Sequence, residues 1–161
     1  MIWEDYMKQT TIIFPIYDDQ VLLGMKKRGF GEGKWNGFGG KLEWDEGFVE
    51  NAQRELREEV WISLLWDQFQ LKAIINFLFQ EWDVIEIFTV SHVFTVPYNG
   101  WWQESDEMRP ELFSLVNLPF DEMWEWDKLW IPQVVWEYNS VKKFDVIYDK
   151  NFNLLECNET S

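Results

Sequence analysis

Apolar residues gather in short segments that alternate with polar residues or run unbroken for a few positions, and both patterns are typical of β-strands. The segments are rich in β-branched and aromatic side chains, which favour an extended backbone. They predict strands at Thr10–Tyr17, Gln20–Lys26, Phe69–Phe79 and Val84–Val96, and a closing hairpin of Phe144–Tyr148 and Phe152–Glu156 around the turn Asp149–Asn151.

Two other segments show helical spacing. From Gly47 to about Glu59, apolar residues recur every four positions, which predicts an amphipathic helix. A second helix is predicted from Leu129 to Tyr138, with Pro132 in its first turn, where a missing N–H is tolerated. Strands and helices in this order predict the α/β (α+β) class, with a mixed β-sheet sandwiched between helices.

Length and composition narrow the class of protein. A chain of 161 residues with 47% hydrophobic residues and no internal repeat is expected to form one domain, 1–161. No apolar run approaches the ~20 residues that span a bilayer, so no membrane partner is expected. Cys157 is the only cysteine, which excludes an internal disulfide and favours the reducing cytoplasm.

The charge distribution bears on the partner. A net charge of -15 argues against polymeric nucleic acid, because phosphate binding along a polymer needs a basic surface. Positive charge is nevertheless concentrated in and beside the glycine-dense loop Gly29–Gly40, where Glu32 is the only acid. A solvated basic loop and a site for a small phosphorylated ligand both agree with this pattern. The basic residues are Lys26, Lys27, Arg28, Lys34 and Lys41.

Three glutamates crowd the end of the first predicted helix. Glu55, Glu58 and Glu59 fall at i, i+3 and i+4, so their carboxylates share one face. Like charges at these spacings cost roughly 0.2–0.5 kcal/mol per pair. The repulsion can be offset by Arg54 and Arg57 beside them, or by a bound divalent cation. A simple solvated acidic face is the alternative interpretation.

The spacing around these glutamates favours the functional interpretation. The pattern Gly40-x5-Glu46-x7-Arg54-Glu55-Leu56-x-Glu58-Glu59-x-Trp61-Ile62 resembles the Nudix box, GX5EX7REUXEEXGU, at every position except the last glycine, which is Trp61 here. The resemblance implies a Nudix fold and hydrolysis of a nucleoside diphosphate linked to another moiety.

The resemblance also implies roles for individual residues. Glu46 and Arg54 would form a structural pair that locks the loop to the helix. Mg²⁺, with Mn²⁺ as an alternative, would neutralise the diphosphate and lower the pKa of a water that attacks phosphorus. The implied catalytic residues are Glu55, Glu59 and Glu104, and the implied metal ligands are the Gly39 carbonyl, Glu55, Glu58, Glu59 and Glu104.

Three further stretches point to one branch of the family. LLGMKKRGFGEGKWNGFGGK, ESDEMRP and LPFDEMWEWDKLWIP are similar to the MutT-type oxidised purine nucleoside triphosphatases, or 8-oxo-dGTP diphosphatases. Trp124 offers a flat face to a purine, Asn36 a donor and an acceptor, and a buried Asp127 a proton. The implied substrate-binding residues are Thr11, Lys26, Phe30, Asn36, Phe38, Gly40, Lys41, Phe77, Trp124 and Asp127.

Simpler roles stay open for these residues, since Phe77 and Trp124 also suit a core and Asn36 also suits a turn. Only Asp127 remains of two consecutive aspartates that the animal enzymes have at the base edge, because the position before it is Trp126. That weakens any expectation that oxidised adenine nucleotides are used as well as oxidised guanine nucleotides.

The resemblance therefore implies a monomeric enzyme that cleaves an oxidised purine nucleoside triphosphate to the monophosphate and pyrophosphate, with water attack at the β-phosphorus. One alternative is a Nudix hydrolase for another substrate, such as a dinucleoside polyphosphate or an ADP-sugar. The other is a catalytically silent nucleotide-binding module.

The chain has twelve tryptophans, an excess for its length. Trp61 stands on the box glycine, and Trp44 and Trp126 stand where glycine is common in or near the corresponding loops of the family. A non-glycine residue in the left-handed conformation after a helix costs roughly 1–2 kcal/mol. Either this lineage evolved bulky loops, or the gene reads UGA as glycine, and the codons at 44, 61 and 126 decide between the two.

Overall fold

The computed structural model describes residues 7–136 and 140–161. None of its helices is both long and apolar enough to cross a membrane. The helices are α1 (Phe48–Val60) and α2 (Asp127–Trp136), with short 3₁₀ turns η2 (Trp66–Gln68) and η3 (Phe120–Glu122). The strands are β1 (Lys8–Tyr17), β2 (Gln20–Lys26), β3 (Trp35–Asn36), β4 (Gln70–Glu81), β5 (Val84–Pro97), β6 (Met108–Ser114), β7 (Lys142–Tyr148) and β8 (Leu154–Thr160).

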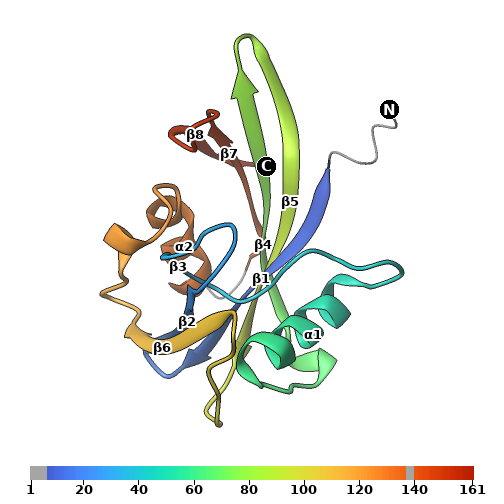
Figure 1. Ribbon diagram of the computed structural model, residues 1–161, viewed down its shortest axis with the longest axis vertical. Helices are drawn as coiled ribbons and strands as arrows, with labels where there is room; N and C mark the ends of the chain where they lie inside the picture. Colours follow the sequence, from blue (N-terminus) through green and yellow to red (C-terminus); the bar gives the residue numbers. More distant parts are fainter. Residues whose placement is uncertain (1–6, 137–139) are drawn as a thin grey trace.

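The strands form one mixed sheet in the order β3-β2-β1-β5-β4-β7-β8, with β6 paired to β2. β1 runs parallel to β5, and β4 runs parallel to β7. The remaining pairs are antiparallel, including the long β4–β5 hairpin that extends beyond the helices in Figure 1.

The two helices lie on opposite sides of this sheet (Figure 1), so the predicted class and the sandwiched arrangement are confirmed. The apolar stripe of α1, with Leu56 and Val60 at its centre, packs on Ile13, Phe38 and Phe94. Each of these side chains is almost fully buried, and burying a large apolar side chain contributes about 1.5–3 kcal/mol.

The second helix covers a separate apolar cluster on the other face. Trp130, Ile131 and Val134 of α2 are buried against strand residues that include Phe14 and Phe144. The two clusters lie above and below β1 and β5, so these central strands carry apolar side chains on both faces.

Several details differ from the sequence expectations, among them the last strand, which was predicted at Phe152–Glu156 and spans Leu154–Thr160. Helix α2 begins at Asp127, two residues before the predicted start, so Pro132 lies in its second turn rather than its first. The predicted end at Tyr138 lies outside the described residues. β6 was not predicted, because Pro110 interrupts its strand pattern; β6 pairs only with β2 in the described sheet, and an edge strand tolerates proline.

The tryptophans in turns and loops differ in backbone conformation and in burial. Trp61 caps α1 with φ 64°, and Trp82 in the β4–β5 turn has φ 58°, both in the left-handed region that favours glycine. Trp44 is 98% exposed in the loop before α1. Trp126 differs from these, because it is buried at 4% exposure and stacks on Trp124.

Replacing Trp61 with glycine is expected to raise the free energy of unfolding by about 1 kcal/mol, because it removes strain at a left-handed position. Urea unfolding measures the change. Trp66→Gly is the matched control, an exposed tryptophan without a positive φ, and it is expected to lower stability or leave it unchanged. If the Trp61→Gly protein is no more stable than wild type, Trp61 does not strain the backbone at this position.

Candidate active site

A two-pronged ion pair joins the loop before α1 to the helix. Arg54 donates from Nε to Glu46 Oε1 at 2.7 Å and from Nη2 to Glu46 Oε2 at 3.1 Å. Glu46 also accepts from the Glu43 N–H and from Asn51 Nδ2, each at 2.9 Å. These bonds, above all those from Arg54, lower the pKa of Glu46 to about 2 and raise the pKa of Arg54.

The same guanidinium offsets the crowding of the glutamates. Nη1 of Arg54 lies 3.1 Å from Glu55 Oε1 and 3.1 Å from Glu58 Oε2. Arg57, the other candidate, makes no ion pair among the residues that the structure describes. Arg54 therefore offsets the repulsion between Glu55 and Glu58.

Glu59 is the most deeply buried member of the acidic face, at 1% exposure. Its Oε1 accepts from the Gly39 N–H at 2.7 Å, whereas Oε2 is buried and has no hydrogen-bond partner in the described part of the chain. Burial raises the pKa of Glu59 to about 8, against the opposing effect of the Gly39 N–H. An unsatisfied buried carboxylate oxygen is costly, so it marks a place where a ligand would be stabilising.

Two glycines let the loop approach the helix this closely. At Gly39, where φ is 145°, a Cβ would lie 1.9 Å from the Thr11 carbonyl oxygen. At Gly40 a Cβ would lie 2.4 Å from Glu55 Oε1. Any side chain here would displace backbone or the carboxylate, and this explains glycine at both positions.

The donor atoms suit a hard divalent cation, which prefers carboxylate and carbonyl oxygens. The buried, unpaired Oε2 of Glu59 supports that fit. In the described residues, however, no three acidic, His or Cys side chains are drawn together closely enough to chelate an ion. Glu55 and Glu58 are held by Arg54 instead.

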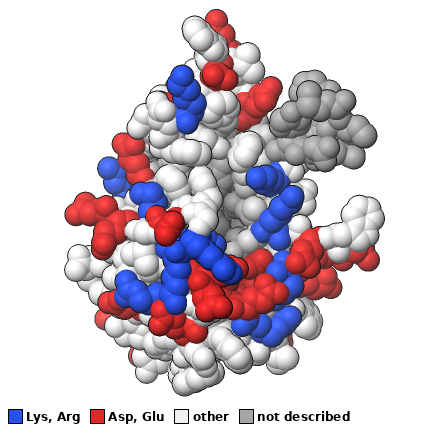
Figure 2. All heavy atoms as spheres, viewed as in Figure 1, with Lys and Arg blue, Asp and Glu red and all other residues white. Residues whose placement is uncertain are grey.

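A second group of acids approaches this face from the loop before β6. Glu104 is paired with Lys27 at 2.5 Å and lines a hollow together with Glu58. Burial is the main cause of the raised pKa of Glu55 and of Glu59, and the charge of Glu107 adds a smaller contribution to both. Figure 2 shows acidic and basic side chains interspersed over the lower half of the molecule.

A cavity of about 480 Å³ opens beside Gly39 and Gly40, on the α2 side of the sheet. Of the predicted substrate residues, it is lined by Thr11, Lys26, Phe30, Asn36, Gly40, Phe77, Trp124 and Asp127. It therefore brings together eight of the ten predicted substrate-binding residues, from parts of the chain that lie far apart in the sequence.

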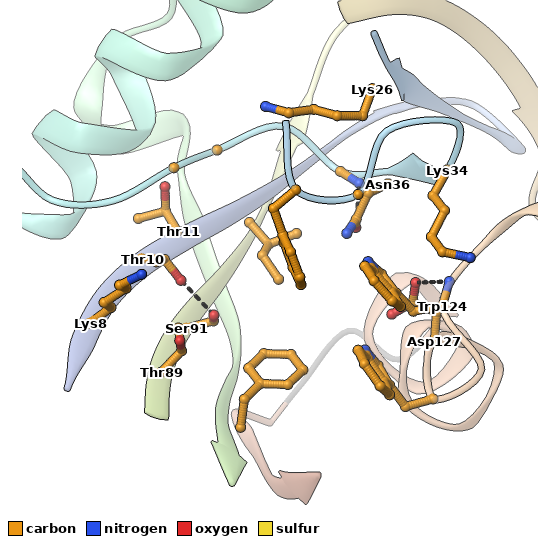
Figure 3. A pocket seen from close by; sticks show the side chains of 18 of the residues that line it. Lys8, Thr10, Thr11, Lys26, Lys34, Asn36, Thr89, Ser91, Trp124 and Asp127 are labelled. Carbon is orange, nitrogen blue, oxygen red and sulfur yellow. Dashed lines mark hydrogen bonds between the residues drawn. The ribbon is translucent and has the colours of Figure 1, made fainter. Parts of the chain in front are cut away.

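The aromatic wall of the cavity is built around Trp124 (Figure 3). Phe30 stacks on Trp124 with ring centroids 5.1 Å apart, and Trp126 lies parallel to it at 5.0 Å. Lys34 Nζ sits 4.8 Å from the centroid of the Trp124 ring. Such a wall provides flat apolar surface of the kind on which a purine stacks.

Two polar groups can read a base beside this wall. Asp127 is buried at 1% exposure, and Oδ2 accepts from the Trp124 N–H at 3.1 Å. Burial raises the pKa of Asp127 to about 7, so the carboxyl can hold a proton near neutrality. Asn36 Oδ1 accepts from the Gly37 N–H at 2.7 Å, which leaves Nδ2 as a donor.

Three predicted residues lie differently from the expectation. Phe38 is fully buried beneath α1 and is not part of the cavity lining. Lys41 is exposed and does not line the cavity. Its backbone carbonyl accepts a hydrogen bond from Asn51 Nδ2 at 2.9 Å. Thr11 touches the cavity, but its hydroxyl donates to Asn51 Oδ1 beneath α1.

Sequence reasoning missed several residues that line the cavity or the neighbouring hollow of Glu58 and Glu104. Glu107 stands in the same ESDEM stretch as Glu104, so the signal for it was present. Lys34 and Trp126 also stand in the quoted stretches. The others come from strands and from the last hairpin, where no local motif marks them. They include Lys8, Thr10, Thr89, Ser91, Tyr148 and Phe152.

Comparison with known proteins places this geometry in a family. A profile of the NUDIX domain matches residues 7–134. The chain belongs to the Nudix family. Nudix hydrolases generally use a divalent metal, in agreement with the oxygen donors of α1 and its loop.

Individual relatives lie close to this Nudix protein. It is 39% identical over 155 residues to a Danio rerio protein named oxidized purine nucleoside triphosphate hydrolase, covering 92% of this chain and 96% of the other. It is 42% identical over 125 residues, 76% of each chain, to a Mus musculus protein of the same name. The crystal structure of a MutT protein from Bacillus halodurans superposes with a TM-score of 0.82 at 26% identity, covering 94% of this chain and 97% of that one.

The Glu46–Arg54 pair predicts a specific dependence of stability on pH. The pKa of Glu46 is lowered from 4.5 to about 2 in the folded protein, so its contribution is present above pH 4.5 and is lost as the pH falls towards 2. The contribution is about 3 kcal/mol. Urea unfolding should show Glu46→Gln less stable than wild type by that order at pH 7, with the difference shrinking below pH 4.5. A difference that is constant with pH contradicts the pairing.

Glu59 predicts the opposite trend. Its folded pKa of about 8 lies above the ordinary 4.5, so the protonated form stabilises fully below pH 4.5 and that stability is lost as the pH rises through 8. With EDTA present, Glu59→Gln should be close to wild type at pH 4.5 and more stable by about 2–4 kcal/mol at pH 8. Thermal or urea unfolding at the two pH values measures this, and Glu58→Gln, at an exposed carboxylate, is the control with little change.

Proposed function

We propose that this Nudix protein hydrolyses oxidised purine nucleoside triphosphates of the 8-oxo-dGTP type to the monophosphate and pyrophosphate, and so cleanses the nucleotide pool. The observation that carries the proposal is one cavity lined both by Trp124 and Asp127 and by the glycines that contact Glu55 and Glu59. A purine and the phosphates attached to it need these two environments at adjoining positions. The names of the animal relatives support the same substrate class.

Recognition of the base rests on the aromatic wall and the two polar groups beside it. The base stacks against Trp124, Asn36 Nδ2 donates to a carbonyl oxygen, and Asp127 Oδ1 either accepts an N–H or donates its proton. A carboxyl with a pKa of about 7 can do either at neutral pH. This adaptability suits a purine whose edge has been changed by oxidation.

The phosphates lie towards α1. Lys26 lines the cavity and carries a positive charge into this acidic site, where it is 3.9 Å from Glu107. Glu55, Glu58, Glu59, Glu104 and the Gly39 carbonyl would hold Mg²⁺, or Mn²⁺ in its place. When bound, the metal would neutralise phosphate charge and lower the pKa of a coordinated water.

The protein's own groups complete the reaction. The buried Oε2 of Glu59 has no hydrogen-bond partner among the described residues. In its ionised form, whose population grows as the pH approaches 8, Glu59 can take the proton of the attacking water. Water adds across a phosphoanhydride bond, and the products are the nucleoside monophosphate and pyrophosphate. Arg54 and Glu46 contact neither the attacking water nor the substrate. They act by holding the loop on the helix.

We further propose that the protein works as a monomer in the cytoplasm. The single cysteine, Cys157, suits a reducing compartment. The cavity and the acidic face are complete within one chain, so activity requires no second copy. Size-exclusion chromatography at working concentration tests the monomer.

Pyrophosphate release with Mg²⁺ across 8-oxo-dGTP, dGTP, 2-hydroxy-dATP and ADP-ribose tests the function. The expected result is a kcat/KM for 8-oxo-dGTP at least ten times that for dGTP, with little hydrolysis of ADP-ribose. A tenfold ratio of kcat/KM corresponds to about 1.4 kcal/mol of difference in binding free energy between the two bases. Glu59→Gln is expected to lose at least a hundredfold in kcat, whereas Gln53→Ala on the same helix should retain the wild-type rate.

Equal rates on 8-oxo-dGTP and dGTP overturn the substrate assignment. Full activity in Glu59→Gln overturns the catalytic site. Preferential cleavage of ADP-ribose supports the alternative of a Nudix hydrolase for an ADP-sugar. Tight binding of 8-oxo-dGMP without turnover of any substrate identifies a silent nucleotide-binding module.

A further inference from the structure

One wall of the cavity is polar at a position where a central sheet is normally apolar. Thr10 on β1 and Ser91 on β5 lie directly opposite each other in the parallel pair, and their Oγ atoms are 2.6 Å apart. Both residues line the cavity, and Ser91 is only 2% exposed. Thr89 lies two residues before Ser91, on the same face of β5 and in the same lining.

The two hydroxyls are not used up by bonding to each other. Each carries one hydrogen and two lone pairs, and either oxygen can be the donor of their mutual bond. One hydrogen and several lone pairs remain for another partner. In a buried setting that unused capacity is costly, so a ligand that meets it is stabilised.

The position of the pair decides what that ligand is. Figure 3 shows Thr10, Thr89 and Ser91 on the opposite side of the cavity from Trp124 and Asp127. A flat ring lying in this cavity, with one edge at Asp127, has another edge directed at the sheet. Purines carry carbonyl, amino or ring N–H groups on every edge except the one joined to the sugar.

We propose that the Thr10–Ser91 hydroxyl pair is a further base-binding contact that hydrogen-bonds the purine edge pointing away from Asp127. This rests on the proposed function, because it takes the ligand of the cavity to be an oxidised purine nucleotide. Since a hydroxyl donates as readily as it accepts, the pair meets a carbonyl oxygen or an N–H of the base.

A purely structural role makes a different prediction. Cross-strand Thr–Ser pairs stabilise sheets by roughly 0.2–1 kcal/mol. Removing such a pair would lower stability without changing ligand affinity. Thr95 provides a comparison, because it lies four residues along β5 on the same face, is buried at 8% exposure, and is outside the cavity lining.

The test measures, by calorimetry, the binding of 8-oxo-dGMP and of 2-hydroxy-dAMP to the full chain. The double variant Thr10→Val and Ser91→Ala is expected to weaken each Kd about tenfold, as two hydrogen bonds are lost. In turnover the loss should fall on KM, with kcat within twofold of wild type. Thr95→Val should bind as wild type does, and a double variant within twofold of wild-type Kd overturns the proposal.

A second comparison separates hydrogen bonding from packing. Thr10→Ser keeps the hydroxyl and should bind within twofold of wild type, whereas Thr10→Val keeps the shape and should bind several-fold more weakly. Equal losses in both variants overturn the proposal. The two hypotheses also fail in different ways. Wild-type protein with no preference for oxidised purines refutes the proposed function. A wild type that prefers them, together with a double variant that binds them as tightly as wild type does, refutes only the hydroxyl contact.

Discussion

The guanidinium of Arg54 is the interaction on which the rest of the site depends. It forms two bonds to Glu46 and also contacts Glu55 and Glu58. Removing it would leave three carboxylates crowded on or against one helix, with Glu46 partly buried and missing its strongest partner. Breaking a buried pair in this way costs about 3–5 kcal/mol, more than an exposed ion pair ever contributes.

Hydrogen bonds of Asn51 connect the Glu46–Arg54 pair to strand β1 and to the glycine loop. Asn51, fully buried, accepts from the Thr11 hydroxyl and donates to Glu46 and to the Lys41 carbonyl. Strand β1, the glycine loop and α1 are thereby fixed to one another around a single side-chain amide. The Gly39 N–H, which bonds Glu59, is held in the same unit. The position of the Glu59 carboxyl therefore depends on the hydrogen bonds that Asn51 makes on the opposite side of the loop.

The resemblance to the Nudix box implied the Glu46–Arg54 pair, whose two residues lie close in the sequence. Glu46 and Arg54 are eight residues apart, and their pairing follows from a loop that turns back on its own helix. The β1–β5 contact is different, because 81 residues separate Thr10 from Ser91 and only strand register brings them together. Phe38 was misplaced for a related reason, since a phenylalanine among glycines shows no periodicity that reveals which face it occupies. The burial of Asp127, at 1% exposure, also comes from tertiary packing, since sequence reasoning treated burial only as a condition for holding a proton.

Gly40 shows how a residue can belong to a site without donating an atom to it. The space its missing side chain leaves is filled by the carboxylate of Glu55, which would lie 2.4 Å from a Cβ. A side chain gained at residue 40 would have to turn the Glu55 carboxylate out of that space. Residues 40 and 55 share one volume, so the orientation of the acid depends on what stands at the glycine.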